Sequence, residues 1–324
     1  MTLIKTTTAA AIAALSFAAS GQAIEPVRVT FESQGETLVG NLYLPDGASS
    51  TQRLPAVVVT GAWTTVKEQM PATYAAELAE RGYAALAFDF RGWGESEGAP
   101  RQLESPVRKT EDIIAAAAYL ASRSDIDAAR VGGLGICASA GYMVAAASMS
   151  EDIASVGLVA PWLHDAEIVD AVYGGAENVA GLIETGRAAE AVFAETGEPV
   201  MIEAASATNE ASLMYQAAYY VDPERGAIAD YVNAFNVASW EGWLSFDALE
   251  IADHLTDPVA IIHSEAAAIP QGAHRFYERT EAPKRALWLD GVSQFNFYDQ
   301  PEAVQRSSDA VAAHFAETLD QGRG

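Results

Sequence analysis

Cysteine and lysine are both scarce in this chain of 324 residues. The only cysteine is Cys137, so no disulfide can form within one chain. The 44 aspartates and glutamates outnumber the 19 lysines and arginines, which gives a formal net charge of −25. Nucleic acids and anionic membranes carry negative charge themselves, so neither is an expected partner of so acidic a protein. The charge excludes these partners but does not point to a substrate.

Metal and nucleotide motifs are missing as well. The sequence has no HxxxH pair, no cysteine pair and no carboxylates clustered at ligand spacing, so we expect no metal site. The glycine-rich segment 132–135 lacks the third glycine that a dinucleotide-binding loop needs at the helix entry, and no phosphate-binding loop is present. We therefore expect no cofactor.

An apolar run with few polar breaks stands near the N-terminus. Lys5 precedes the apolar segment 9–19, and small residues follow up to Ala23. This order is typical of a secretory signal peptide, so residues 1–23 are predicted to be removed by cleavage after Ala23. The run is short for a membrane span, and no later segment offers about 18 apolar residues in succession. The sequence predicts an exported protein, periplasmic or secreted, without a membrane anchor; an uncleaved anchor is the alternative.

Strand and helix patterns alternate through most of the remaining chain. An antiparallel hairpin is expected over 27–31 and 37–44. A continuous apolar run, typical of a buried parallel strand, occupies 54–60, and further strands are expected over 83–88, 153–160, 258–263 and 286–290. Helical patterns cover 71–81, 111–122, 270–280 and 301–319. This alternation predicts an α/β fold with a mostly parallel central sheet flanked by helices.

The alternation stops over residues 163–250, which hold alanine-rich helical stretches and several aromatic residues. A structureless loop of that length would be unusual in a compact domain. We therefore predict a helical cap inserted over the active site. The core domain would comprise residues 24–162 and 251–324.

The segment that carries the expected chemistry is 131–141, with the sequence VGGLGICASAG. It passes from strand character to helix character at Cys137, as in the nucleophile elbow of the α/β-hydrolase fold. Gly135 and Ser139 satisfy the need for small residues on either side. The helix N-terminus favours a thiolate, and the Ala138 N–H is a candidate oxyanion donor. The alternative is a buried cysteine in a core strand.

A second oxyanion donor is expected from the loop after the strand 54–60, because such loops face the ligand crevice. Trp63 stands there as donor or pocket wall, or as simple packing over the strand end. After the next strand, Asp89 and Arg91 are expected to form a buried ion pair that pins the loop, with a catalytic role as the alternative.

The usual partners of an elbow nucleophile are an acid and then a histidine along the chain. Glu265 is the candidate acid, but the final loop holds Gln294 where the histidine should stand. Glutamine cannot accept a proton near neutral pH. Three hypotheses remain: His164 or, less favoured, His263 supplies the base; Cys137 acts as a preformed thiolate with Gln294 as hydrogen-bond donor; or the site only binds a ligand.

Five motifs together resemble one branch of the α/β-hydrolase superfamily, related to the dienelactone hydrolases and to fungal polyketide transferases. The motifs are TVKEQ (65–69), LAFDFRGWGES (86–96), PRQLESP (100–106), GICASAGY (135–142) and SQFNFYD (293–299).

The resemblance implies a nucleophile at Cys137, with Ser139 in place of the second glycine of the dienelactone hydrolase elbow. It implies the acid at Glu265 and puts the family histidine at or next to Gln294. The implied function is hydrolysis of an ester, thioester or lactone with a small hydrophobic acyl group, through an acyl-enzyme. The alternatives are polyketide-type acyl transfer, or ligand binding without effective catalysis.

Overall fold

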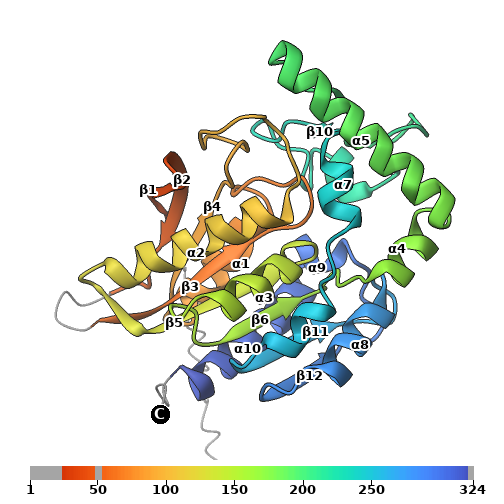
Figure 1. The fold of residues 1–324 in the computed structure, drawn as a ribbon. Helices are drawn as coiled ribbons and strands as arrows, with labels where there is room; N and C mark the ends of the chain where they lie inside the picture. Colours follow the sequence, from red (N-terminus) through yellow and green to blue (C-terminus); the bar gives the residue numbers. More distant parts are fainter. Residues whose placement is uncertain (1–23, 48–52, 320–324) are drawn as a thin grey trace, which may run out of the picture.

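An eight-stranded sheet forms the centre of the molecule (Figure 1). The structure, a computed structural model, describes residues 24–47 and 53–319. The strand order is β1-β2-β4-β3-β5-β6-β11-β12. The strands are β1 (Val27–Ser33), β2 (Glu36–Tyr43), β3 (Leu54–Thr60), β4 (Ala84–Phe88), β5 (Ile126–Ile136), β6 (Val156–Val159), β11 (Val259–His263) and β12 (Lys284–Trp288). Only β1–β2 and β2–β4 pair antiparallel, which confirms the predicted mostly parallel sheet.

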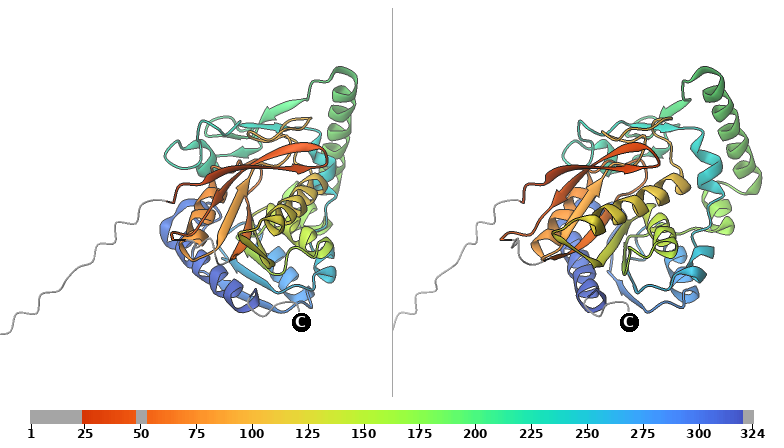
Figure 2. Two further views of the ribbon diagram at one scale, coloured as in Figure 1. Left: turned by 90° about the vertical axis from the view of Figure 1, so that its left-hand side faces the viewer. Right: turned by 60° about the vertical axis from the view of Figure 1, so that its left-hand side comes forward.

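Helices cover both faces of this sheet. Helices α1 (Met70–Glu80) and α10 (Pro301–Thr318) pack together on one face, and α2 (Pro106–Ser122) and α3 (Ser139–Met149) pack together on the other (Figure 2). Every residue of β4 is buried, as the continuous apolar run predicts for a strand covered on both sides. Helix α2 begins earlier than its periodicity suggests, because the Ser105 side chain accepts the Arg108 N–H and caps it.

Between β6 and β11 the chain leaves the sheet and forms the cap. Its elements are α4 (Ala166–Val172), α5 (Ala176–Thr196), β7 (Met201–Glu203), β8 (Ala205–Ser206), β9 (Met214–Tyr215), α6 (Ala218–Val221), β10 (Ala234–Asn236), α7 (Ser239–Leu244) and the 3₁₀ helix η1 (Glu250–His254). The cap holds helices, as predicted, and also short strands that the sequence pattern did not predict. Two ladders, antiparallel β7–β10 and parallel β8–β9, lie among the helices. Their strands of two or three residues are too short for an alternating pattern to reveal them.

Helix α5 stands out from the body of the molecule, whereas the later part of the cap is joined to core loops (Figures 1 and 2). Gln69 Nε2 donates to the Gly226 carbonyl at 2.6 Å. Arg225 forms an ion pair of 2.6 Å with Asp299, in the short helix α9 (Asn296–Asp299). These contacts hold the cap against the loops at the carboxyl ends of the parallel strands, where α/β sheets bind ligands.

None of the helices in residues 24–47 and 53–319 combines the length and the apolar character needed to cross a membrane. The predicted signal peptide, residues 1–23, lies outside the described residues. Within the described ranges, no cluster of three or more metal-ligating side chains was found.

Three histidines are buried in the core, and burial lowers the pKa of each to about 4: His164, His263 and His314. The unfolded chain takes up protons at these positions near pH 6.5, but the folded protein does not until about pH 4. The contribution of these three histidines to the free energy of unfolding is therefore fully present above pH 6.5 and is lost as the pH falls toward 4.

The variant His263→Phe tests this linkage. The imidazole packs against Trp288 and Phe297, and within the described residues neither ring nitrogen makes a well-aligned hydrogen bond, although the Ala268 backbone is in reach. Phenylalanine should fill this space and remove one proton-linked group. Between pH 7 and pH 5 we expect the variant to lose about 2 kcal/mol less unfolding free energy than wild type, measured by urea denaturation. The linkage would be contradicted if wild type and His263→Phe lost the same unfolding free energy between pH 7 and pH 5. It would also be contradicted if the control His254→Gln, at an exposed histidine, reduced that loss as much as His263→Phe does.

Candidate active site

Cys137 lies at the turn between β5 and α3. Its φ of +58° is in the left-handed region, which a residue with a side chain rarely adopts. A Cβ on Gly135 would lie 2.7 Å from the Ala140 Cα, so this position cannot carry a side chain without a shift of the helix. The Ser139 hydroxyl accepts the Ile136 N–H and donates to the Ile136 carbonyl, both at 3.1 Å. The serine thus closes the turn, and the backbone has the geometry of a nucleophile elbow.

Four groups hydrogen-bond the Cys137 sulfur. They are the backbone N–H groups of Trp63 and Ala138 and the side chains of Tyr298 and Gln294. The two backbone donors come from the end of β3 and the start of α3, the two places from which the fold supplies an oxyanion hole. The structure therefore brings together four of the six predicted site residues: Cys137, Ala138, Trp63 and Gln294.

The protonation state of Cys137 is set mainly by burial, which raises the pKa of the thiol. Hydrogen bonds from Tyr298 and the other three groups lower this pKa, but the net shift is upward. The Ala138 N–H at the start of α3 lowers this pKa, as the prediction from the helix N-terminus requires, but burial outweighs it, so the hypothesis of a preformed thiolate is wrong for the resting site. At neutral pH the group is a thiol, and a reaction must remove its proton.

The loop that carries Trp63 is anchored by a buried carboxylate. Thr64 has a φ of +63°, and its N–H donates to Glu104 Oε2 at 3.3 Å. The other oxygen of Glu104 accepts hydrogen bonds from Lys109 Nζ at 2.7 Å and from the Tyr142 hydroxyl at 2.9 Å. This buried network fixes the direction of the backbone at Trp63.

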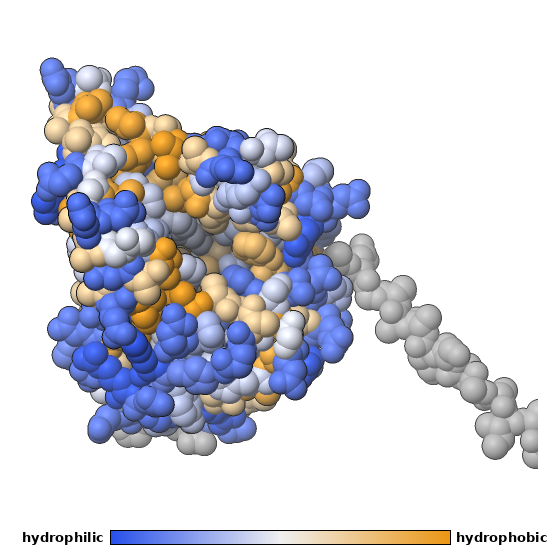
Figure 3. Space-filling model, turned by 90° about the vertical axis from the view of Figure 1, so that its right-hand side faces the viewer, coloured by the Kyte–Doolittle hydropathy of each residue, from blue (hydrophilic) through white to orange (hydrophobic). Residues whose placement is uncertain are grey.

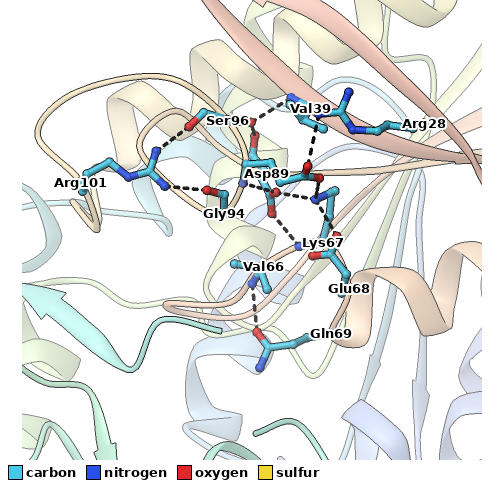
Figure 4. A network of polar contacts seen from close by, with 11 residues as sticks. Arg28, Val39, Val66, Lys67, Glu68, Gln69, Asp89, Gly94, Ser96 and Arg101 are labelled. Atoms are coloured by element: carbon cyan, nitrogen blue, oxygen red, sulfur yellow. Dashed lines mark hydrogen bonds and ion pairs between the residues drawn. The ribbon is translucent and has the colours of Figure 1, made fainter. Parts of the chain in front are cut away.

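A second network holds the same loop from its other end (Figure 4). Lys67 Nζ lies 2.8 Å from Asp89 Oδ2, and the Lys67 N–H donates to Asp89 Oδ1 at 2.8 Å. The predicted pairing of Asp89 with Arg91 is wrong, since Arg91 pairs with Asp112 instead. Both residues are buried and paired as expected for buried charges, but each finds its partner in a different part of the chain.

Gln294 is fixed by hydrogen bonds on every side. Its Oε1 accepts the Ala268 N–H at 3.0 Å, while its Nε2 donates to the Ala160 carbonyl at 2.9 Å and to the Tyr298 hydroxyl at 3.0 Å. These partners settle which amide atom is nitrogen, because a backbone N–H can face only the oxygen and a carbonyl only the nitrogen. Both hydrogens of the Nε2 amide are therefore engaged, so Gln294 makes only the weakest of the four contacts with the sulfur and acts on it chiefly through Tyr298.

The other two predicted residues point elsewhere. Glu265 is exposed and bonds to His274 Nε2 at 2.7 Å, and it does not line the cavity at Cys137. His164 is buried; its Nδ1 accepts the Trp162 indole N–H, and its Nε2 donates to the Trp243 carbonyl. Because both ring nitrogens of His164 already have hydrogen-bond partners, neither is free to accept the proton of Cys137, and the geometry disfavours His164 as the base.

Sequence reasoning missed the tyrosines of the site. Tyr298 reaches the sulfur from α9, and Tyr220 donates to the Trp63 carbonyl at 3.1 Å. Tyr173, which is half-buried, accepts the Trp243 indole N–H at 2.7 Å. A signal for Tyr298 was present in its spacing of four residues from Gln294, which places both on one side of a helical turn.

Cys137 opens into a cavity of about 530 Å³ between cap and core. In the space-filling view, apolar side chains surround a hollow on the face beside α5 (Figure 3). Among the described residues that line the cavity, none is charged. They are Trp63, Cys137, Ala138, Trp162, Val172, Tyr173, Leu213, Met214, Tyr220, Trp243, Ala268, Gln294, Phe295 and Tyr298. This size and lining suit a small, uncharged and largely apolar ligand.

Comparison with known proteins identifies the family. The family of the X-Pro dipeptidyl-peptidases (S15 family) matches residues 34–292. This range includes the elbow, the cap and all strands of the sheet from β2 to β12. The chain belongs to this S15 family. The S15 match supports a hydrolase, and the resemblance to the α/β hydrolases is confirmed.

Two bacterial relatives match the S15 chain over most of its length. YcjY of Escherichia coli K12, an uncharacterized protein, is 31% identical over 298 residues, which cover 86% of this chain and 93% of YcjY. PA2218 of Pseudomonas aeruginosa is 30% identical over 310 residues, covering 91% and 81% of the two chains. A shorter match joins residues of this chain to the polyketide transferase claH of Penicillium crustosum, with 33% identity over 134 residues, 40% of this chain and 43% of claH.

Solved structures agree with the S15 assignment at the level of the fold. The crystal structure of PA2218 superimposes with a TM-score of 0.80 and 27% identity, over 91% of this chain and 94% of that one. The α/β hydrolase GrgF from Penicillium sp. sh18 has a TM-score of 0.74 and 20% identity, over 90% and 99% of the two chains. The second likeness shows the fold alone.

Proposed function

We propose that this S15-family protein is an acyl hydrolase that forms a covalent acyl-Cys137 intermediate on an ester, thioester or lactone. The observation that carries the proposal is the convergence of two backbone N–H groups, from Trp63 and Ala138, on the sulfur of a strained elbow. The same donors would stabilise the oxyanion that forms when the sulfur attacks a carbonyl carbon. The substrate is a small molecule whose acyl group is hydrophobic, since the cavity is aromatic and uncharged.

The nucleophile is a cysteine although S15 is a serine peptidase family. Ser139 is the serine next to the elbow, and its hydroxyl is bound to the Ile136 backbone and buried. It does not line the cavity, whereas Cys137 does. A peptide substrate with a charged N-terminus is also disfavoured, because the described residues of the cavity lining include no carboxylate to pair with that charge.

The leaving group decides which acyl donors suit the site. In the acylation step the S–C bond forms, the bond to the leaving group breaks, and the thiol proton passes to the leaving group. The described part of the cavity lining holds no histidine or carboxylate to assist that transfer. A thiolate, with a thiol pKa of about 8.5, departs readily, whereas an alkoxide is a far stronger base. We therefore place thioesters ahead of alkyl esters.

The fate of the acyl group gives the first alternative. Attack of water on the acyl-Cys137 needs a base, and Gln294 is none. A second substrate with a good nucleophile would accept the acyl group more easily, which would make the protein an acyl transferase; the match to the polyketide transferase claH supports this alternative.

A second candidate function is ligand binding without turnover. The glutamine at the position of the usual base and the raised pKa of Cys137 favour it. Such a protein would hold a hydrophobic ligand between cap and core, and its affinity would not depend on the thiol.

Intact-protein mass spectrometry separates these functions. The protein is exposed briefly to a hexanoyl thioester of N-acetylcysteamine, and separately to ethyl hexanoate. We expect wild type to gain one hexanoyl group from the thioester and to react more slowly with the ethyl ester. The decay of the adduct in water, with and without an added thiol or amine, distinguishes hydrolase from transferase. No adduct, with the thiol still alkylated by iodoacetamide, would sink the catalytic proposal in favour of ligand binding.

We also propose that the protein is exported through residues 1–23 and is free of the membrane after cleavage. The proposal rests on the positive start at Lys5 and the apolar run behind it. Cleavage after Ala23 would leave the whole sheet intact, because β1 begins at Val27. Expression of the full chain in a bacterial host should give a periplasmic product whose N-terminal residue is Ile24 by mass spectrometry. A cytoplasmic product that keeps Met1 would contradict it.

A further inference from the structure

The Tyr298 hydroxyl lies at the Cys137 sulfur, in a site that holds no histidine among its described lining residues. Its ring is buried, 1% exposed, and its hydroxyl hydrogen-bonds the Cys137 sulfur. The helix α9 that carries it is held on the outside by the ion pair between Arg225 and Asp299. Its hydroxyl is therefore presented to the sulfur by a fixed backbone.

The direction of the hydrogen bond between Tyr298 and Cys137 follows from the bond that Gln294 makes to Tyr298. A phenol has one hydrogen to donate. Gln294 Nε2 donates to the Tyr298 oxygen, so the phenol hydrogen must point to another acceptor. The sulfur is the acceptor that the described residues offer. The hydrogen bonds thus run in one direction, from the Ala268 N–H to Gln294, from Gln294 to Tyr298, and from Tyr298 to Cys137.

We propose that Tyr298, oriented by Gln294, is a catalytic residue that stabilises negative charge on the Cys137 sulfur by hydrogen-bond donation. Gln294 is then a positioning residue, and it stands where a base would stand because its task is to fix a donor. The inference deepens the proposed function and depends on it only for the reaction that the charged sulfur performs.

Stabilisation of the thiolate has a definite place in the reaction. As the thiol proton passes to the leaving group and the S–C bond forms, the sulfur bears negative charge, and a donated hydrogen bond lowers the energy of that state. When the acyl group is later transferred, the sulfur departs as a thiolate and the same hydrogen bond assists its departure. Tyr298 keeps its own proton throughout, because burial raises the pKa of the phenol well above its usual range.

The experiment measures the rate of iodoacetamide alkylation between pH 6 and pH 10. Because Cys137 is the only cysteine, every thiol that is alkylated is this one, and peptide mass spectrometry separates it from alkylated amines or imidazoles. In Tyr298→Phe we expect the inflection to move upward, with about a tenfold lower rate below the inflection, since the thiolate loses a charge-assisted hydrogen bond. Gln294→Leu should move it in the same direction by less, and this variant carries the test if Tyr298→Phe does not fold.

Tyr74→Phe is the matched control. The Tyr74 hydroxyl is buried and donates to the Phe297 carbonyl of the same helix α9 at 2.7 Å, and it is not one of the four groups that hydrogen-bond the sulfur. It should lose stability but keep the wild-type pH profile. A wild-type profile in both Tyr298→Phe and Gln294→Leu, or an equal shift in Tyr74→Phe, would overturn the inference. Alkylation needs no acyl donor, so this result stands apart from the failure or success of the proposed acylation.

Discussion

Replacement of Cys137 by alanine should abolish the acyl adduct and reduce turnover of a thioester by about 10³-fold or more, because the atom that bonds the acyl group is gone. The fold should survive, since the side chain loses one sulfur atom at a position that lines a cavity. The left-handed φ of +58° stays equally unfavourable for alanine. Mass spectrometry after exposure to the hexanoyl thioester, with a kinetic assay of released thiol, measures both effects.

Cys137→Ser is the informative companion of this variant. A serine hydroxyl is far less acidic than a thiol, and neither Gln294 nor Tyr298 accepts its proton. We therefore expect the serine variant to be nearly as inactive as the alanine variant. Ligand affinity of the cavity should stay close to that of wild type in both. An alanine variant that keeps full turnover would refute the cysteine mechanism.

The sheet was predictable because its central strands are fully buried and carry long apolar runs. The run 54–60 became β3 with the same bounds, and the hairpin was found from its alternating pattern. The β ladders of the cap were not predictable from the sequence. Their strands pair through two or three residues each, so contacts between distant segments determine them, and local propensity does not.

The site divides in the same way. Cys137, Ala138 and Trp63 follow from the rule that loops at strand ends meet, because the backbone alone positions their N–H groups. Glu265 also stands after a strand, but its side chain bonds to His274, which stacks on Trp288 and holds the carboxylate outside the cavity. Side-chain direction in a loop depends on such tertiary partners. The sequence can therefore predict that a residue lies near the site, but not whether its side chain points into the cavity.

The variant Lys67→Met should cost the fold about 3–5 kcal/mol, the expected loss when one partner of a buried ion pair is removed. The Lys67 side chain is 1% exposed, and that of Asp89 is fully buried. Burial by itself would lower the pKa of Lys67, but the Asp89 carboxylate raises it above its usual value, so the pair is charged. Methionine keeps the length of the side chain and leaves the aspartate without its cation. Urea denaturation measures the loss.

The effect of Lys67→Met should reach the active site, because Lys67 holds the loop whose N–H at Trp63 faces the sulfur. At a temperature where the variant is folded, we expect slower acylation of Cys137. Adding Asp89→Asn removes the fully buried charge and should restore part of the stability, whereas the partly exposed carboxylates of Glu68 and Glu95, which also pair with Lys67, remain. Arg187→Ala, which breaks an exposed ion pair with Glu241, is the control and should leave the unfolding free energy close to that of wild type. A Lys67→Met variant as stable as this control would mean that the buried pair does not hold the loop, and that the backbone hydrogen bonds to Asp89 and Glu104 suffice to position the oxyanion donor.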